Sequence, residues 1–254
     1  MILAIDAGNT NVVIGGYIEK ELKFVFRIRT DRYKTSDEYA ALIASIVKMR
    51  GYDTNDLEGG VISSVVPNLY AVLSKALKRM GAKNVLTIGP GIKTGLDIRI
   101  DMPSQLGSDM VASGAAVLKN YTCPAIVIDL GTATKISCID KNGAIIGCSI
   151  MPGVNISLDA LVGKTAQLAL VSLEGEVNLI GKNTVDSIKS GSVLGTASMI
   201  DGMIDRYREE LDENLTAIAT GGIAPNIIPY CKSKIITDQN IVLNGLFIIY
   251  EKNI

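Results

Sequence analysis

The chain begins with an apolar stretch that ends in an acid and a glycine, Ile2-Leu3-Ala4-Ile5-Asp6-Ala7-Gly8-Asn9-Thr10. The pattern predicts a buried strand over Ile2–Asp6, followed by a sharp polar turn. A second stretch of the same kind lies near the middle of the chain, Ile126-Val127-Ile128-Asp129-Leu130-Gly131-Thr132. A strand followed by an acid, a glycine and hydroxyl residues thus occurs twice. We interpret this recurrence as an internal duplication.

The elements expected after each stretch also follow one plan. In the first half we expect two strands, Asn11–Ile18 and Leu22–Thr30, followed by a helix over 37–49. After these we expect a strand over Gly60–Val66, a helix from Asn68 to about Met80, a strand over Asn84–Ile88 and a helix over 105–119. In the second half we expect three strands, Ala125–Leu130, Lys135–Asp140 and Ala144–Met151, followed by helices over 156–167 and 184–211. After these we expect a strand over Ala217–Thr220, a short helix, a strand over Lys234–Thr237 and a C-terminal helix. This order predicts an α/β fold of two βββαβαβα lobes, residues 1–121 and 122–254. It resembles the ribonuclease-H-like, actin-like architecture, in which two lobes face a central cleft.

Composition limits the chemistry. Histidine is absent, which excludes Ser-His-Asp and Cys-His nucleophiles and HExxH metal sites. The cysteines form no CxxC pair, and we interpret them as buried or incidental thiols. A net charge of −1 predicts no nucleic-acid or membrane partner. We also expect no signal peptide and no membrane-spanning segment, and therefore a cytoplasmic protein.

The two turns are candidate phosphate-binding loops. In the first, Gly8 lets backbone amides approach phosphate oxygens and Thr10 can donate a hydrogen bond. Asp6 would repel phosphate, so we expect it to hold Mg²⁺, directly or through water. An ordinary hairpin with an Asx-type turn is the alternative. The repetition of acid, glycine and hydroxyls in residues 129–134 favours the phosphate interpretation.

A third motif, Ala219-Thr220-Gly221-Gly222, follows a predicted strand. Paired glycines there would let the base and ribose of a nucleotide lie against the backbone, whereas a plain helix-entry turn is the alternative. No GxxxxGK[ST] motif occurs and no GxGxxG follows a strand, so P-loop and Rossmann sites are excluded. The three motifs together predict an ATP site.

Gly107-Ser108-Asp109 opens a predicted helix, whose dipole favours an anion at this end. If a hydroxyl group is phosphorylated, Asp109 is the candidate base. Simple N-capping of the helix by Ser108 or Asp109 is the alternative.

With these motifs the chain resembles the type III pantothenate kinase family along nearly its whole length. The resemblance implies a homodimer that phosphorylates pantothenate with ATP and Mg²⁺ in the first committed step of coenzyme A synthesis. It implies Asp109 as general base, and Gly107, Ser108, Asp109, Met110 and Thr184 as pantothenate contacts. Asp129 resembles the ligand of a monovalent cation, normally potassium, near the dimer interface. ATP binding is assigned by the resemblance to Asp6, Ala7, Gly8, Asn9, Thr10, Asn11, Val12, Val13 and Thr132, with Gly221 and Gly222 on the adenosine side.

The departures from the family pattern gather at the acceptor side. Met110 stands where the family has an arginine that meets the pantothenate carboxylate, although a buried role for Met110 is equally open. Lys135 replaces a threonine, and its ammonium could stand in for potassium (or ammonium) at Asp129, or it could be a solvated surface lysine. The remaining departures are Met102, Ala169-Leu170 and Lys189. Two other functions therefore stay open, namely a kinase for a different small alcohol and a nucleotide-binding regulator without turnover.

Overall fold

The computed structural model describes residues 1–163 and 171–254. The chain forms two compact units, and each is built around one sheet. Unit 1 comprises residues 1–96, 101–120 and 240–254, and unit 2 comprises residues 97–100 and 121–239.

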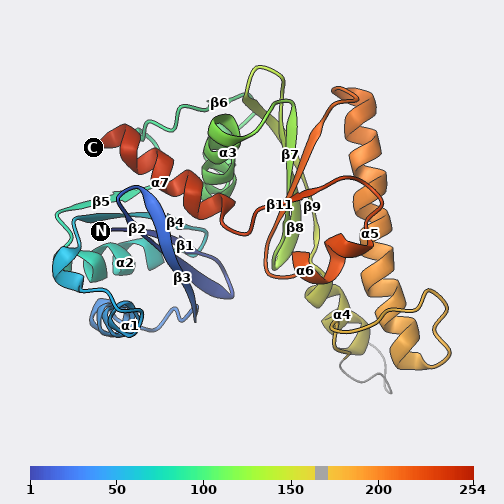
Figure 1. Ribbon diagram of the computed structural model, residues 1–254, viewed down its shortest axis with the longest axis horizontal. Coiled ribbons are helices and arrows are strands. Elements are labelled where there is room, and N and C mark those ends of the chain that lie inside the picture. The colour runs from blue at the N-terminus through green and yellow to red at the C-terminus, as the bar shows by residue number, and fades with distance from the viewer. Residues whose placement is uncertain (164–170) are drawn as a thin grey trace. The chain divides into compact units, whose positions relative to one another are not determined.

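Unit 1 contains a five-stranded sheet in the order β3-β2-β1-β4-β5 (Figure 1). The first three strands are antiparallel, and β4 and β5 run parallel to β1. Glu19 and Lys20 form the turn between β2 and β3, with left-handed φ values of 52° and 67°. The elements are β1 (Ile2–Ala7), β2 (Asn11–Ile18), β3 (Glu21–Arg29), α1 (Ser36–Met49), β4 (Gly59–Ser64), α2 (Leu69–Arg79), β5 (Asn84–Thr87), α3 (Ser108–Asn120) and α7 (Ile241–Asn253), with short 3₁₀ turns at Thr54–Asp56 and Pro103–Gln105.

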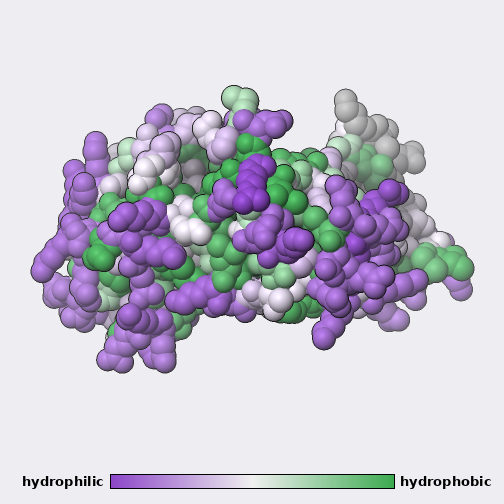
Figure 2. All heavy atoms as spheres, turned by 90° about the horizontal axis from the view of Figure 1, so that it is seen from above, coloured by the Kyte–Doolittle hydropathy of each residue, from purple (hydrophilic) through white to green (hydrophobic). Residues whose placement is uncertain are grey.

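The two faces of this sheet are both covered. Leu3 and Ile5 of β1 pack with residues of α1 and α2 in one core, whereas Ala4 packs with Ala112 of α3 and residues of α7 in another. The alternation along β1 therefore serves two apolar layers, which explains why residues 2–5 of the strand are all apolar. In the face shown in Figure 2, polar side chains cover much of the surface and hydrophobic atoms emerge between them.

Unit 2 repeats the plan around β7. Its sheet has the order β11-β10-β7-β8-β9-β6, with β7, β8 and β9 antiparallel and β10 and β11 parallel to β7. Apart from the edge strand β6, order and direction match those of unit 1, so the predicted duplication is confirmed. The elements are β6 (Asp97–Ile98), β7 (Ala125–Leu130), β8 (Ala133–Ile139), β9 (Ala144–Pro152), α4 (Val154–Gly163), α5 (Thr184–Glu210), β10 (Thr216–Thr220), α6 (Ala224–Ile227), a 3₁₀ turn at Ile228–Tyr230 and β11 (Ile236–Thr237).

Some expectations differ from the structure. The units differ from the predicted lobes 1–121 and 122–254, chiefly because α7 packs on α3 and β1 in unit 1. Helix α3 begins at Ser108, since the residues before it form the turn Pro103–Gln105. The helix expected over 156–167 ends at Gly163 among the described residues, and the rest of that prediction lies outside them.

Candidate active site

The first predicted phosphate loop joins β1 to β2 and is braced by the segment after β3. The amide of Gly8 donates to the carbonyl of Asn11 (2.9 Å), and the amide of Thr30 donates to the carbonyl of Thr10 (3.0 Å). The hydroxyl of Thr30 donates to the carbonyl of Gly8 (2.7 Å). The side chains of Asn9, Thr10 and Asn11 are exposed on this braced turn.

The predicted ATP-binding range Asp6–Val13 divides into core and surface positions. Ala7 and Val12 are fully buried, so only their backbones can meet a ligand, and Val13 is half-buried. Asp6 is also half-buried, at the carboxyl end of β1. In parallel sheets this end of the strands is where ligands bind.

The structure brings Asp6 and Asp109 to the same edge of the unit 1 sheet. Asp6 of β1 lies directly beside Ser63 of β4. The hydroxyl oxygen of Ser63 is 2.9 Å from that of Ser108, the first residue of α3. Asp109 follows in the same helical turn, so the predicted metal ligand and the predicted base share this edge.

The carboxylate of Asp109 is held close to the start of its own helix. Its Oδ1 accepts the amide of Met110 (2.9 Å). A Cβ atom at Gly107 would lie 2.5 Å from this oxygen, so glycine gives the carboxylate its room. The hydroxyl of Ser108 bonds toward β4, and these bonds do not have the geometry of simple N-capping. Met110 has only 8% of its surface exposed, which agrees with the buried role that the sequence left open.

The second predicted phosphate loop, residues 129–134, carries an ion pair. Asp129 and Lys135 face each other across β7 and β8, and Lys135 Nζ lies 2.9 Å from Asp129 Oδ2. The Lys135 side chain is 19% exposed, so it is a partner of Asp129 and not a solvated surface lysine. Thr132 lies exposed in the same loop.

The paired glycines after β10 pack against this loop. Thr220 lies beside Asp129 in the sheet, and the amide of Ile223 donates to the carbonyl of Leu130 (3.1 Å). Gly221 has a φ of 98°, and a Cβ there would lie 2.5 Å from the Leu130 backbone. Gly222 is exposed, and a Cβ there would meet nothing within 4 Å. Gly221 thus serves packing, while Gly222 presents open backbone.

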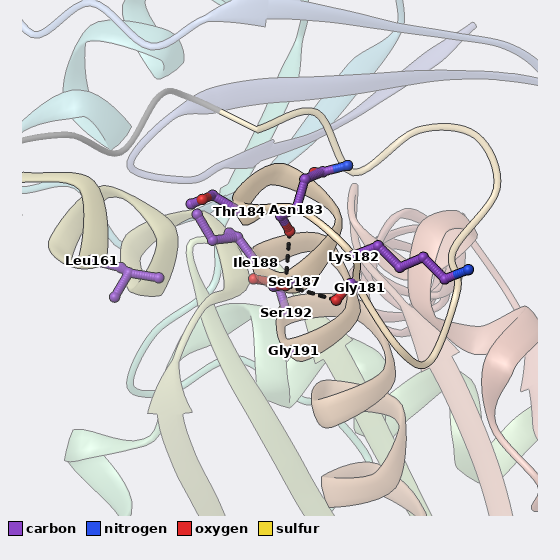
Figure 3. Close-up of a pocket in the computed structure, with 9 residues that line it drawn as sticks. All are labelled: Leu161, Gly181, Lys182, Asn183, Thr184, Ser187, Ile188, Gly191 and Ser192. Carbon is purple, nitrogen blue, oxygen red and sulfur yellow. Dashed lines mark hydrogen bonds between the residues drawn. The ribbon is translucent and has the colours of Figure 1, made fainter.

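A pocket of about 610 Å³ lies beside Thr184 in unit 2 (Figure 3). Asn183 caps α5, since its Oδ1 accepts the amide of Asp186 (2.9 Å), and the hydroxyl of Ser187 donates to the Asn183 carbonyl (2.8 Å). In Figure 3 the Lys182 side chain extends away from Leu161. The residues that line the pocket are Leu161, Gly181, Lys182, Asn183, Thr184, Ser187, Ile188, Gly191 and Ser192.

Two other departures from the family pattern, Lys189 and Met102, have contacts of their own. The ammonium of Lys189 donates to the carbonyl of Glu174. Met102 is 55% exposed, with Gln105 Nε2 3.3 Å from its sulfur. Ala169 and Leu170 lie outside the described residues.

Two of the cysteines have thiols with strongly raised pKa values. Burial raises the pKa of the Cys138 thiol to about 11 and that of Cys231 to about 12, which keeps both protonated near neutral pH. Within residues 1–163 and 171–254, no three His, Cys, Asp or Glu side chains form a metal-binding group. In the same ranges no helix is long and apolar enough to cross a membrane.

Comparison with known proteins identifies a matching family and solved structures with the same fold. A family model described as type III pantothenate kinase matches residues 2–206. The type III pantothenate kinase of Moorella thermoacetica is 40% identical over 253 residues, which cover 100% of both chains. Solved structures with the same fold include the activator of the 2-hydroxyisocaproyl-CoA dehydratase from Clostridium difficile with bound ADPNP (TM-score 0.60, 12% identity, 98% of this chain and 94% of that one). A second is MreB5 of Spiroplasma citri bound to ADP (TM-score 0.51, 14% identity, 99% and 96%).

Proposed function

We propose how the residues of this chain divide the work of its reaction, given that the chain belongs to the type III pantothenate kinase family. Members of this family transfer a phosphoryl group from ATP to pantothenate in the synthesis of coenzyme A, and so does this chain. The two other functions that the sequence left open, a kinase for another alcohol and a regulator without turnover, are not favoured by any observation.

We assign the ATP phosphates to the turn Gly8–Asn11 and to Thr132, and the adenosine to the backbone of Gly222. The hydrogen bonds to the carbonyls of the first loop hold its backbone, from which the exposed side chains project. Gly222 has no side chain and leaves room for the adenosine to lie against its backbone. Asp6 fits a Mg²⁺ ligand, because Mg²⁺ takes one or two carboxylates and fills its other positions with phosphate oxygens and water. When bound, Mg²⁺ neutralises charge on the phosphates during transfer.

Asp109 is the proposed general base. The observation that carries this assignment is its position at the sheet edge that also holds Asp6, reached through Ser63 and Ser108. Asp109 takes the proton of the terminal hydroxyl of pantothenate, the freed oxygen attacks the γ-phosphorus, and ADP leaves with the bridging oxygen. Gly107, Ser108 and Met110 of unit 1 and Thr184 of unit 2 are the proposed acceptor contacts, as the family pattern implies.

The test is Asp109→Asn. We expect turnover to fall by roughly 10²–10⁴-fold, because an amide cannot accept the proton, while ATP affinity stays unchanged. ADP release with and without pantothenate gives the turnover, and a calorimetric titration gives the affinity. Asp101→Asn, an exposed acid outside the helix, is the matched control. A loss smaller than about tenfold in Asp109→Asn would exclude Asp109 as the base.

Three further assignments concern the setting of the enzyme. Lys135 supplies the monovalent positive charge that a potassium ion gives Asp129 in the family pattern, supported by their 2.9 Å ion pair. The chain acts as a homodimer, which its family suggests and which the exposed apolar side chains Ile146 and Ile150 of β9 support. Its compartment is the cytoplasm, where its substrate ATP is available.

A further inference from the structure

Ser63 is a polar residue in an apolar strand. Residues 59–63 of β4 are all buried, and the Ser63 side chain has 0% of its surface exposed. A buried hydroxyl costs free energy unless it is hydrogen-bonded. The bond of Ser63 goes to the hydroxyl of Ser108, 45 residues away, at 2.9 Å. This bond ties the end of β4 to the first turn of α3.

The hydroxyl of Ser108 has two partners in β4. Its Oγ lies 2.9 Å from Ser63 Oγ, a bond in which either hydroxyl can donate, and 3.4 Å from the carbonyl of Ser64. These hydrogen bonds of Ser108 with Ser63 and Ser64 thus hold the start of α3 against two neighbouring residues of β4.

The hydrogen bond between Ser63 and Ser108 joins the neighbours of the two acids of the proposed mechanism. Ser63 is the neighbour of Asp6 in the sheet, and Ser108 precedes Asp109 in the chain. The carboxylate of Asp109 is in turn restrained by the amide of Met110. A shift of α3 along β4 would therefore move the base relative to Asp6.

We propose that Ser63 is a positioning residue, which sets the place of the base Asp109 through Ser108. This inference rests on the proposed role of Asp109. A misplacement of about 1 Å can lower a rate by about 10²-fold, so a single buried hydroxyl suffices for a large effect on turnover.

The experiment compares Ser63→Ala with Ser113→Ala in the full-length chain. Ser113 is also buried in α3, but its hydroxyl donates to the carbonyl of Met110 inside the helix, so its removal leaves the tie to β4 intact. We expect Ser63→Ala to lower kcat by about 10- to 100-fold with both KM values nearly unchanged. Ser113→Ala should lose a similar amount of thermal stability and little kcat. Ser63→Cys, which keeps a weak donor of similar shape, should recover part of kcat and tests the idea if the alanine variant folds poorly.

Combination with Asp109→Asn separates this inference from the assignment of the base. If Ser63 acts through Asp109, adding Ser63→Ala to Asp109→Asn should change single-turnover rates little. An equal loss in both backgrounds, an unchanged kcat in Ser63→Ala, or an equal loss in Ser113→Ala would each overturn the positioning role while leaving Asp109 as the base. An active Asp109→Asn would instead refute the base and, with it, this inference.

Discussion

Gly221 and Gly222 are adjacent, yet their surroundings differ. At Gly221 the backbone is left-handed and an added Cβ would press on Leu130, whereas at Gly222 the space is open. We expect Gly221→Ala to lower the free energy of unfolding by at least about 2 kcal/mol, through strain and overlap. Urea unfolding followed by circular dichroism measures this loss.

Gly222→Ala is the matched control for stability and a test of the adenosine site. Its free energy of unfolding should stay within about 1 kcal/mol of the unmodified protein. Its KM for ATP should rise, because the new methyl group stands where the nucleotide would lie. If the KM for ATP is unchanged in a stable Gly222→Ala variant, the adenosine does not lie on this backbone.

The ion pair of Lys135 with Asp129 leads to a prediction about how activity depends on salts. Because its ammonium is already paired with Asp129, potassium or ammonium chloride should change activity by less than about twofold at constant ionic strength. Lys135→Thr should create a dependence on potassium. Lys141→Thr, an exposed lysine in the turn between β8 and β9, should not. Strong activation of the unmodified protein by potassium would show that Lys135 does not replace the ion.

At the scale of elements, α3 and α7 pack closely at Gly245. An added Cβ at Gly245 of α7 would overlap the carbonyl of Ala112 in α3. Gly245→Ala should therefore force the helices apart, at a cost of about 1–3 kcal/mol in the free energy of unfolding.

Gly202 provides the comparison, because it lies within α5 and an added Cβ there meets nothing within 4 Å. Gly202→Ala should stabilise the protein by about 0.5–1 kcal/mol, since alanine is the better helix former. Denaturant unfolding should show a lower free energy of unfolding for Gly245→Ala and a higher one for Gly202→Ala, if the contact of Gly245 is as close as described. A neutral Gly245→Ala would mean that α7 can move without cost.

At the scale of the whole molecule, the proposed homodimer can be tested on β9. Sedimentation should give twice the chain mass of 27.0 kDa. Ile150, 65% exposed on an outward row of β9, should lie in the interface, and Ile150→Glu should shift the protein to the monomer. Met49→Glu, at an 81% exposed position of α1, should leave the mass unchanged. A dimer that tolerates Ile150→Glu would place the interface elsewhere.

Much of the fold could be predicted from the sequence because its signals are local. The boundaries of β2 and β7 agree with the prediction, since alternation and turn residues act over a few positions. The strand β6 has two residues, Asp97 and Ile98, and is too short to leave such a pattern. The repeated acid, glycine and hydroxyl motif indicated the duplicated sheet, which the strand orders confirm.

The sequence by itself determined the duplicated architecture and the family, and it predicted which residues form the phosphate loops. Only the tertiary structure decided that α7 joins unit 1, that Met110 is buried, that Lys135 pairs with Asp129 and that Ser63 reaches Ser108. In the sequence, the only sign of a role for Ser63 is that serines end a buried strand. This sign does not indicate which residue Ser63 bonds to. The reason is physical. Strand and turn patterns record interactions between near neighbours, whereas a side chain's burial and its partner depend on segments that are distant in sequence and meet only when the sheet and its helices have packed.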